Sequence, residues 1–149
     1  LKYRDSCYNY TMIIRSEQEM LNFGKDFAKH QLRSDNSVAT VLELIGDVGA
    51  GKTTFTRGLA EGLNISEPIT SPSFTISKQY ALKNGGRLVH YDFYRLQDPG
   101  IMSEDLSEAL QNPSNIIVIE WGESISDLLP DDHHVIKFNY TENGREVTL

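Results

Sequence analysis

The sequence predicts a single-domain α/β fold with a mainly parallel sheet, flanked by antiparallel strands and hairpins. Residues 38–45 and 116–119 are apolar and rich in β-branched residues, as in strands buried on both faces of a parallel sheet. A helix predicted over residues 52–63 follows the first of these strands and gives the strand–helix succession of such sheets. The turn sequences Lys83-Asn84-Gly85-Gly86 and Glu142-Asn143-Gly144 predict the antiparallel hairpins.

The first predicted elements are a short strand at residues 10–14 and a helix that runs to about Leu32. The helix begins at a capping box, Ser16-Glu17-Gln18-Glu19, in which the Ser16 hydroxyl and the Glu19 carboxylate each accept a hydrogen bond from a backbone amide. Its apolar residues fall roughly on one face, as expected for a helix packed against a core: Met20, Phe23, Phe27 and Ala28.

The later elements alternate strands, turns and helices. In chain order we expect a loop at 34–37, the strand at 38–45, the helix at 52–63, strands at 74–82 and 87–93, a helix at 103–110, and strands at 116–119, 135–140 and 145–149. Asp98-Pro99-Gly100 interrupts the chain before the short helix. His133 and His134, beside two aspartates, are interpreted as a solvated turn.

The composition excludes several classes of protein. The 149 residues carry 14 Lys and Arg against 21 Asp and Glu, and a net charge of −7 disfavours a large surface for nucleic-acid phosphates. The single cysteine, Cys7, excludes an internal disulfide and any multi-cysteine metal site. Because no apolar run approaches the ~18 residues of a membrane span, we expect a cytoplasmic protein without a membrane contact. Residues 1–11, which open with Leu1, are expected to be a truncated leader or a segment foreign to the natural protein.

The glycine-rich turn matches the phosphate-binding pattern G-x-x-x-x-G-K-[ST]. Its residues are Gly46, Asp47, Val48, Gly49, Ala50, Gly51, Lys52 and Thr53. Loop amides and the helix N-terminus hold the phosphates, the Lys52 ammonium reaches the β- and γ-phosphates, and the Thr53 hydroxyl binds Mg²⁺. Asp47 is interpreted as a residue of loop geometry rather than a metal ligand. The fold class is therefore P-loop NTPase-like (Walker A), with residues 12–149 as the nucleotide-binding domain.

Two acids end apolar strands, where sites of parallel sheets lie. These are Asp92 and Glu120, and each could bind Mg²⁺ or orient an attacking water. His90 is interpreted as a packed or hydrogen-bonded residue rather than a zinc ligand, because no second ligand stands at metal spacing. Trp121 is placed either near the mouth of the site or in the core. The segment at residues 70–74 is either a switch that senses the γ-phosphate or an ordinary loop.

Four segments, in this order and spacing, resemble the bacterial TsaE (YjeE) family, the ATPase of tRNA threonylcarbamoyladenosine biosynthesis. They are Gly-Asp-Val-Gly-Ala-Gly-Lys-Thr-Thr-Phe (46–55), Thr-Ser-Pro-Ser-Phe (70–74), His-Tyr-Asp-Phe-Tyr-Arg-Leu (90–96) and Ile-Glu-Trp (119–121). The phosphate loop is shared with many unrelated NTPases, but its combination with the last two segments is specific. The resemblance covers the chain from about Met12 onward. Ser73 stands where the family usually has Thr, and it keeps the hydroxyl.

The resemblance implies an ATPase that binds ATP or ADP with Mg²⁺, acts with the proteins TsaB and TsaD, and reaches tRNA only through that complex. It implies that Lys52 holds phosphates, that Thr53 and Glu120 bind Mg²⁺, that Asp92 is required for hydrolysis, and that Trp121 lies close to the nucleotide. The family's pocket also draws on the start of the first helix and on the C-terminal turn. The corresponding residues here are Ser16 and Glu17 at the start of the first helix and Gly144 and Arg145 at the C-terminal turn. Thr54, which directly follows Thr53, is also expected to bind the nucleotide.

Three other functions would use the same phosphate loop, and the kinase and the adaptor among them remain open. A small P-loop kinase of a nucleoside or metabolite would need an acceptor pocket and usually an arginine-bearing lid, and no arginine-rich stretch is present. A GTPase would carry the guanine-reading N-K-x-D, which this sequence lacks. A non-catalytic adaptor gated by nucleotide occupancy would keep the same motifs. Because the sequence shows no obvious arginine finger in cis, we expect hydrolysis to be slow without partners.

Overall fold

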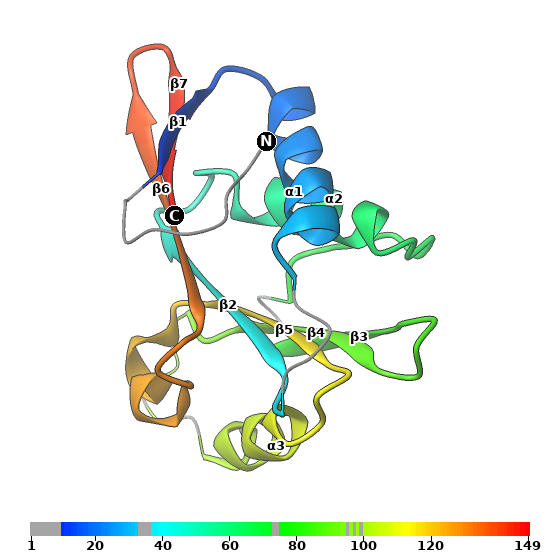
Figure 1. The fold of residues 1–149 in the computed structure, drawn as a ribbon. Helices are drawn as coiled ribbons and strands as arrows, with labels where there is room; N and C mark the ends of the chain where they lie inside the picture. The colour runs from blue at the N-terminus through cyan, green and yellow to red at the C-terminus, as the bar shows by residue number, and fades with distance from the viewer. Residues whose placement is uncertain (1–9, 33–36, 73–74, 95, 97, 99) are drawn as a thin grey trace. The chain divides into compact units, whose positions relative to one another are not determined.

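The computed structural model describes residues 10–32, 37–72, 75–94, 96, 98 and 100–149 (Figure 1). Its strands are β1 (Thr11–Ile14), β2 (Thr40–Gly46), β3 (Ser77–Ala81), β4 (Arg87–Asp92), β5 (Ile116–Glu120), β6 (His134–Thr141) and β7 (Gly144–Thr148). Its helices are α1 (Glu17–His30), α2 (Lys52–Gly62), α3 (Ile101–Leu110) and the 3₁₀ helix η1 (Gly122–Leu128). The strands form a mixed seven-stranded sheet in the order β1-β7-β6-β2-β5-β4-β3, which confirms the predicted α/β class.

The chain divides into two compact units. Unit 1 comprises Leu1–Leu32, Ile45–Ile69 and Ile136–Leu149, and unit 2 comprises Arg33–Leu44 and Thr70–Val135. The interpretations placed on Cys7, on most of the segment 1–11, and on Ser73 and Phe74 lie outside the described residues. Thr11, the last residue of that first segment, opens β1 and pairs with Thr148 of β7.

The predicted helices and strands are present, with ends that differ by a few residues, but one element was not predicted and one prediction needs correction. The sequence did not predict η1, because its Gly-Glu-Ser-Ile-Ser-Asp-Leu stretch lacks the apolar spacing of an α-helix. The turn at His133 is not simply solvated. The Nε2 atom of His133 lies 3.0 Å from Glu43 Oε2 and its Nδ1 atom 2.6 Å from Pro130 O, while His134 opens β6. Glu43 is remote in sequence, so the local pattern could not show this partner.

Unit 1 holds the two helices α1 and α2 beside the antiparallel strands β1, β7 and β6. The Ser16 Oγ atom accepts a hydrogen bond from Glu19 N at 3.1 Å, as the capping box predicts. The Glu19 carboxylate accepts from Arg15 N at 2.7 Å rather than from the amide of Ser16. The predicted bond to the Ser16 hydroxyl is therefore confirmed. The Glu19 carboxylate accepts from the backbone amide one residue before the predicted one.

Glycines bring α1 and α2 into close contact within unit 1. A Cβ atom built on Gly58 would lie 2.2 Å from Leu21 O, and one built on Gly24 would lie 2.3 Å from Phe55 O. These distances are far below van der Waals contact and involve backbone atoms, so the helices would have to separate to admit a side chain. Beneath this contact the rings of Phe23 and Phe55 have centroids 5.2 Å apart.

Replacing Gly58 by alanine should therefore destabilise the protein, although alanine is the better helix former. We expect a loss of about 1–3 kcal/mol from overpacking, which lowers the melting temperature by roughly 2–12 °C. Thermal unfolding followed by circular dichroism measures this, with Gln18→Ala at an exposed position of α1 as the control. An unchanged or higher melting temperature for Gly58→Ala would contradict the close approach of the helices.

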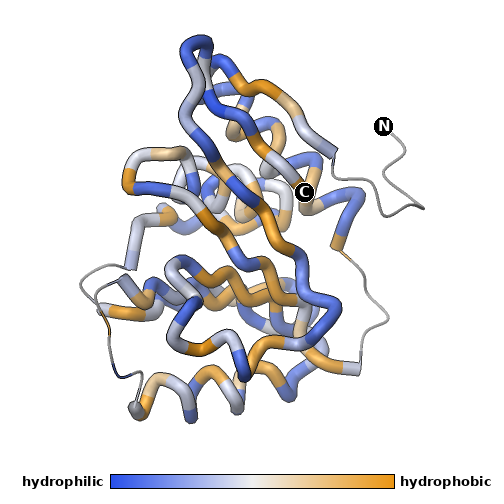
Figure 2. The backbone as a smooth tube through the Cα atoms, turned by 90° about the vertical axis from the view of Figure 1, so that its left-hand side faces the viewer, coloured by the Kyte–Doolittle hydropathy of each residue, from blue (hydrophilic) through white to orange (hydrophobic). Residues whose placement is uncertain are grey.

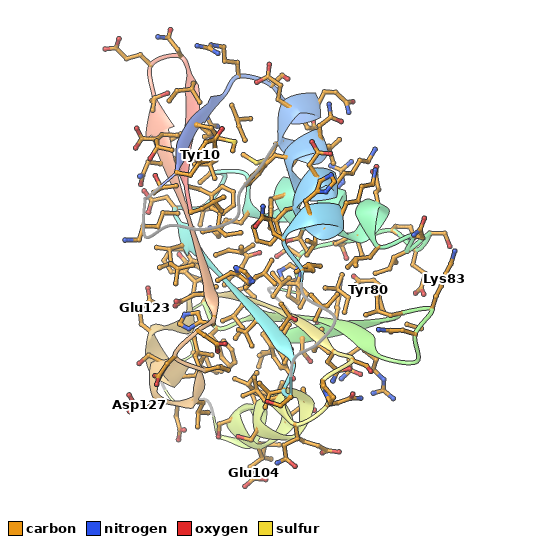
Figure 3. All side chains as sticks on the ribbon, in the orientation of Figure 1. Tyr10, Tyr80, Lys83, Glu104, Glu123 and Asp127 are labelled. Atoms are coloured by element: carbon orange, nitrogen blue, oxygen red, sulfur yellow. The ribbon has the colours of Figure 1, made fainter. Side chains whose placement is uncertain are left out.

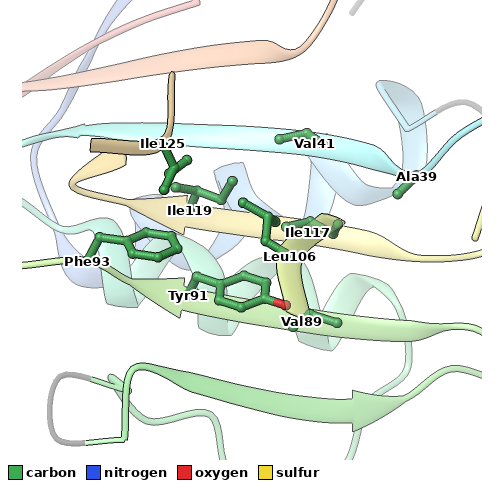
Figure 4. Packing of buried hydrophobic residues seen from close by; sticks show 9 residues of the cluster. All are labelled: Ala39, Val41, Val89, Tyr91, Phe93, Leu106, Ile117, Ile119 and Ile125. Carbon is green, nitrogen blue, oxygen red and sulfur yellow. The ribbon is translucent and has the colours of Figure 1, made fainter. Parts of the chain in front are cut away.

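Unit 2 contains the parallel part of the sheet. β5 lies between β2 and β4 and is parallel to both, and β3 pairs antiparallel with β4. Leu106 of α3 and Ile125 of η1 pack with apolar strand residues in one cluster (Figure 4). The members are Ala39, Val41, Val89, Tyr91, Phe93, Leu106, Ile117, Ile119 and Ile125. The Tyr91 hydroxyl donates to Asp105 Oδ2 at 2.5 Å, and burial, followed by this bond, raises the pKa of Tyr91.

Several acidic side chains lie on the surface. Figure 2 shows apolar stretches along the strands and a hydrophilic turn between β6 and β7. Glu104 of α3 and Glu123 and Asp127 of η1 are exposed and project outward (Figure 3). In the described part of the chain, no helix has both the length and the hydropathy required to cross a bilayer.

Candidate functional site

The phosphate loop joins β2 to α2, as predicted. β2 ends at Gly46 and α2 begins at Lys52, with Gly51 as its N-cap. Gly49 and Gly51 have φ angles of +79° and +109°, in the left-handed region that glycine adopts without strain. A Cβ atom on Gly46 would lie 2.6 Å from Phe138 O. The glycines of the motif thus allow the loop to adopt this backbone conformation. The loop exposes amide groups at the start of a helix.

The Lys52 side chain is buried against this loop. The residue is only 5% exposed, and its Nζ atom donates to Gly46 O at 2.5 Å and to Asp47 O at 2.9 Å. Burial of an ammonium group is costly unless it is bonded, and loop carbonyls supply the bonds. An anion at the loop would add the opposite charge, so these residues fit a phosphate group. Asp47 itself is exposed, and its described bond to Lys52 uses the backbone carbonyl, in line with its interpretation as a loop residue.

A pocket of about 320 Å³ in unit 1 combines the loop with two other segments. Its lining residues are Ile14, Arg15, Ser16, Glu17, Met20, Gly49, Gly51, Thr54, Gly144 and Arg145. The structure therefore brings Glu17, Thr54 and Gly144, which were predicted from motifs far apart in the sequence, onto one pocket. Its volume is in the range of small-molecule sites. A second hollow of about 370 Å³ lies along β1 and α1 and is lined by none of the predicted site residues.

Arg57 is a residue of this pocket's surroundings that the sequence did not predict. Its Nη1 atom donates to Glu17 Oε1 at 2.9 Å, which links the start of α1 to α2. Both side chains are substantially exposed, so the ion pair adds little stability.

The two candidate acids end neighbouring parallel strands of unit 2. Asp92 and Glu120 face each other in the register of β4 and β5, and Leu44 of β2 pairs with Glu120 on the other side. The phosphate loop begins two residues after Leu44 on the same strand. Both acids are buried, at 6% and 4% exposure. Both acids therefore lie at the carboxyl ends of parallel strands, as predicted.

Each acid is held by described neighbours. The Oδ1 atom of Asp92 accepts from Tyr94 N at 2.9 Å, and its backbone amide donates to Ile76 O at 2.8 Å. The Oε1 atom of Glu120 lies 2.9 Å from Nε2 of His90, which is fully buried. This confirms that His90 is a packed, hydrogen-bonded histidine. The Nδ1 atom of His90 has no hydrogen-bond partner among the described residues.

Two residues with unusual backbone geometry adjoin these acids. Trp121 has φ +58° and Ile76, which is β-branched, has φ +66°, a conformation that costs energy for such a side chain. Trp121 is half-buried, packs against the unit 2 core cluster, and has its ring 4.9 Å from that of Tyr94. Thr70 of the candidate switch is bonded to Lys78 of β3. These segments are thus tied to the sheet edge that bears the acids.

The side chains predicted to bind a metal ion carry oxygen donors. Within the described ranges, no cluster of three or more His, Cys, Asp or Glu side chains is placed to hold a metal ion. Mg²⁺ needs no such cluster, because it takes one or two protein oxygens together with phosphate oxygens and water. The Thr53 hydroxyl, in the first turn of α2, and the Glu120 carboxylate, at the end of β5, are each a hard oxygen donor of this kind.

Comparison with known proteins agrees with these observations. A family model described as "Threonylcarbamoyl adenosine biosynthesis protein TsaE" matches residues 14–147. The chain is 34% identical over 139 residues to the tRNA threonylcarbamoyladenosine biosynthesis protein TsaE of Haemophilus influenzae, covering 93% of this chain and 87% of the relative. It is 41% identical over 113 residues to the protein of that name from Bacillus subtilis, covering 73% and 68%. The crystal structure of Bacillus subtilis YdiB superposes with a TM-score of 0.72 at 30% identity, covering 97% of this chain and 86% of that one.

Proposed function

Because the chain belongs to the TsaE family of tRNA threonylcarbamoyladenosine biosynthesis, we propose that it is the ATP-binding and ATP-hydrolysing subunit of this machinery. We further propose that it acts with the proteins TsaB and TsaD and meets tRNA only through that complex, in the cytoplasm. The observation that carries the proposal is the pocket in which the phosphate loop meets the start of α1 and the start of β7.

The proposed roles follow from residue chemistry. Lys52 neutralises the β- and γ-phosphates, and the loop amides orient them. Thr53 and Glu120 would hold Mg²⁺, which when bound neutralises charge on the phosphate oxygens. Asp92 is buried beside Glu120 in the register and would orient the attacking water. Trp121, directly after Glu120, would lie close to the nucleotide.

Nucleotide binding can be followed through Trp121, which is the sole tryptophan. We expect a saturable, Mg²⁺-sensitive change in fluorescence with ADP and ATP and none with GDP or GTP. Trp121→Phe, which removes the signal, is the control, and calorimetry gives the affinity independently. Binding by calorimetry without a fluorescence change would place Trp121 away from the nucleotide. Absence of binding by both methods would overturn the proposed function.

Hydrolysis separates the proposed enzyme from its alternatives. Phosphate release from ATP should be slow with the purified protein and should rise when TsaB and TsaD are added, because no arginine finger in cis is evident in the sequence. A high turnover that is independent of partners would contradict this expectation. Binding without hydrolysis, even in the presence of both partners, would instead favour a nucleotide-gated adaptor.

A further inference from the structure

Tyr140 of β6 contacts the phosphate loop from the C-terminal hairpin. Its hydroxyl donates to the backbone carbonyl of Val48 at 2.7 Å. A Cβ atom built on the next residue, Gly49, would lie 2.8 Å from that hydroxyl oxygen. The contact joins two segments that are 92 residues apart in the sequence but belong to the same compact unit. Tyr140 is 51% exposed, so burial of its ring does not explain its position.

Arg145 holds Tyr140 against the loop. The two residues face each other in the register of β6 and β7, and the Arg145 guanidinium carbon lies 4.2 Å from the centre of the Tyr140 ring. The Nη2 atom of Arg145 also donates to Gly49 O at 3.5 Å, and its Nη1 atom donates to Gly144 O at 3.0 Å. The C-terminal hairpin thus binds two consecutive carbonyl groups of the phosphate loop.

These bonds set the direction of loop amides. In a planar trans peptide the C=O and N–H groups point in opposite directions. A hydroxyl that holds the Val48 carbonyl therefore also fixes the direction of the Gly49 N–H, which belongs to the same peptide group. Amides of a glycine-rich loop bind phosphate only when they converge, and Gly49, at φ +79°, has the conformational freedom to turn otherwise.

We propose that Tyr140 is a positioning residue that orients the Val48–Gly49 peptide of the loop for the nucleotide phosphates. The proposal rests on the proposed function, because it takes a nucleoside diphosphate or triphosphate as the ligand. Tyr140 acts through the backbone of the loop and makes no contact with the reacting atoms. Orientation of the peptide requires the Tyr140 hydroxyl, whereas the Tyr140 ring packs against the Arg145 guanidinium.

The test is the substitution Tyr140→Phe, which keeps the ring and its contact with Arg145 and removes the donor. By calorimetry in the presence of Mg²⁺, we expect ADP to bind roughly 2- to 10-fold more weakly, the range for loss of one hydrogen bond. AMP, which lacks the β-phosphate that the loop binds, should bind the variant and the unaltered protein equally. Tyr10→Phe, at an exposed tyrosine that lines the second hollow and not the pocket of the phosphate loop, should leave both affinities unchanged.

The outcomes separate this proposal from the function on which it rests. If the unaltered protein binds ADP and Tyr140→Phe binds it equally well, the positioning role is wrong and the nucleotide function stands. If ADP and AMP affinities fall by the same factor, the hydroxyl supports the pocket in general and the phosphate-specific role is wrong. If the unaltered protein binds no ADP, both proposals fail.

Discussion

Replacing Lys52 by alanine should weaken the binding of ATP and ADP about 10- to 100-fold, the range for loss of a charge-assisted hydrogen bond to phosphate. The ammonium is buried at the loop and bonded to the carbonyls of Gly46 and Asp47, so its charge is already placed where phosphates would bind. No other side chain of the loop is cationic. Calorimetric titration with ADP and ATP measures the effect.

A matched control separates charge at the loop from charge in general. Lys29→Ala removes an exposed lysine from α1 in the same unit and should leave the affinity unchanged. The melting temperature of Lys52→Ala should change little, because the lost bonds are offset by the removal of a buried charge. Nucleotide affinity that survives Lys52→Ala would show that the loop does not bind phosphate in the assigned way.

The sequence could predict what depends on local patterns. The loop from Gly46 to Thr53 is contiguous, and its glycines are required by the backbone geometry that the structure shows at Gly49 and Gly51. Asp92 and Glu120 could be found because each follows an apolar strand directly, and parallel strands bring their carboxyl ends to one edge. The Asn-Gly turn at Gly144 predicted the hairpin of β6 and β7, because that signal is also local.

The partners of these residues could not be predicted, because the contacts join distant parts of the chain. Glu17 and Arg57 are 40 residues apart, Glu43 and His133 are 90 apart, and Tyr140 is 92 residues from Val48. Surface side chains of these types are common, and nothing in their local sequence selects one partner. His90 shows the intermediate case. A packed or hydrogen-bonded histidine was predicted because no second ligand stands at metal spacing, whereas its bond to Glu120 depends on the pairing of β4 with β5.

The hydrogen bond between Glu120 and His90 determines which substitution of Glu120 is informative. Substitution by alanine would leave His90 without its buried partner and would mix a loss of stability with a loss of function. Glutamine keeps the shape of the side chain and an oxygen that can accept from His90 Nε2, and it removes the negative charge. Glu120→Gln should therefore fold with nearly the melting temperature of the unaltered protein.

With that bond retained, the effect of Glu120→Gln should appear in Mg²⁺-dependent chemistry. We expect ATP hydrolysis in the presence of TsaB and TsaD to fall on the order of 10²-fold, because a lost metal ligand removes several kcal/mol of charge stabilisation. Nucleotide affinity measured with EDTA should be unchanged, since the charge would act through the metal ion. Glu123→Gln, an exposed acid on η1, should hydrolyse ATP like the unaltered protein. A large drop in melting temperature together with normal hydrolysis per folded molecule would instead mean that Glu120 is a structural partner of His90.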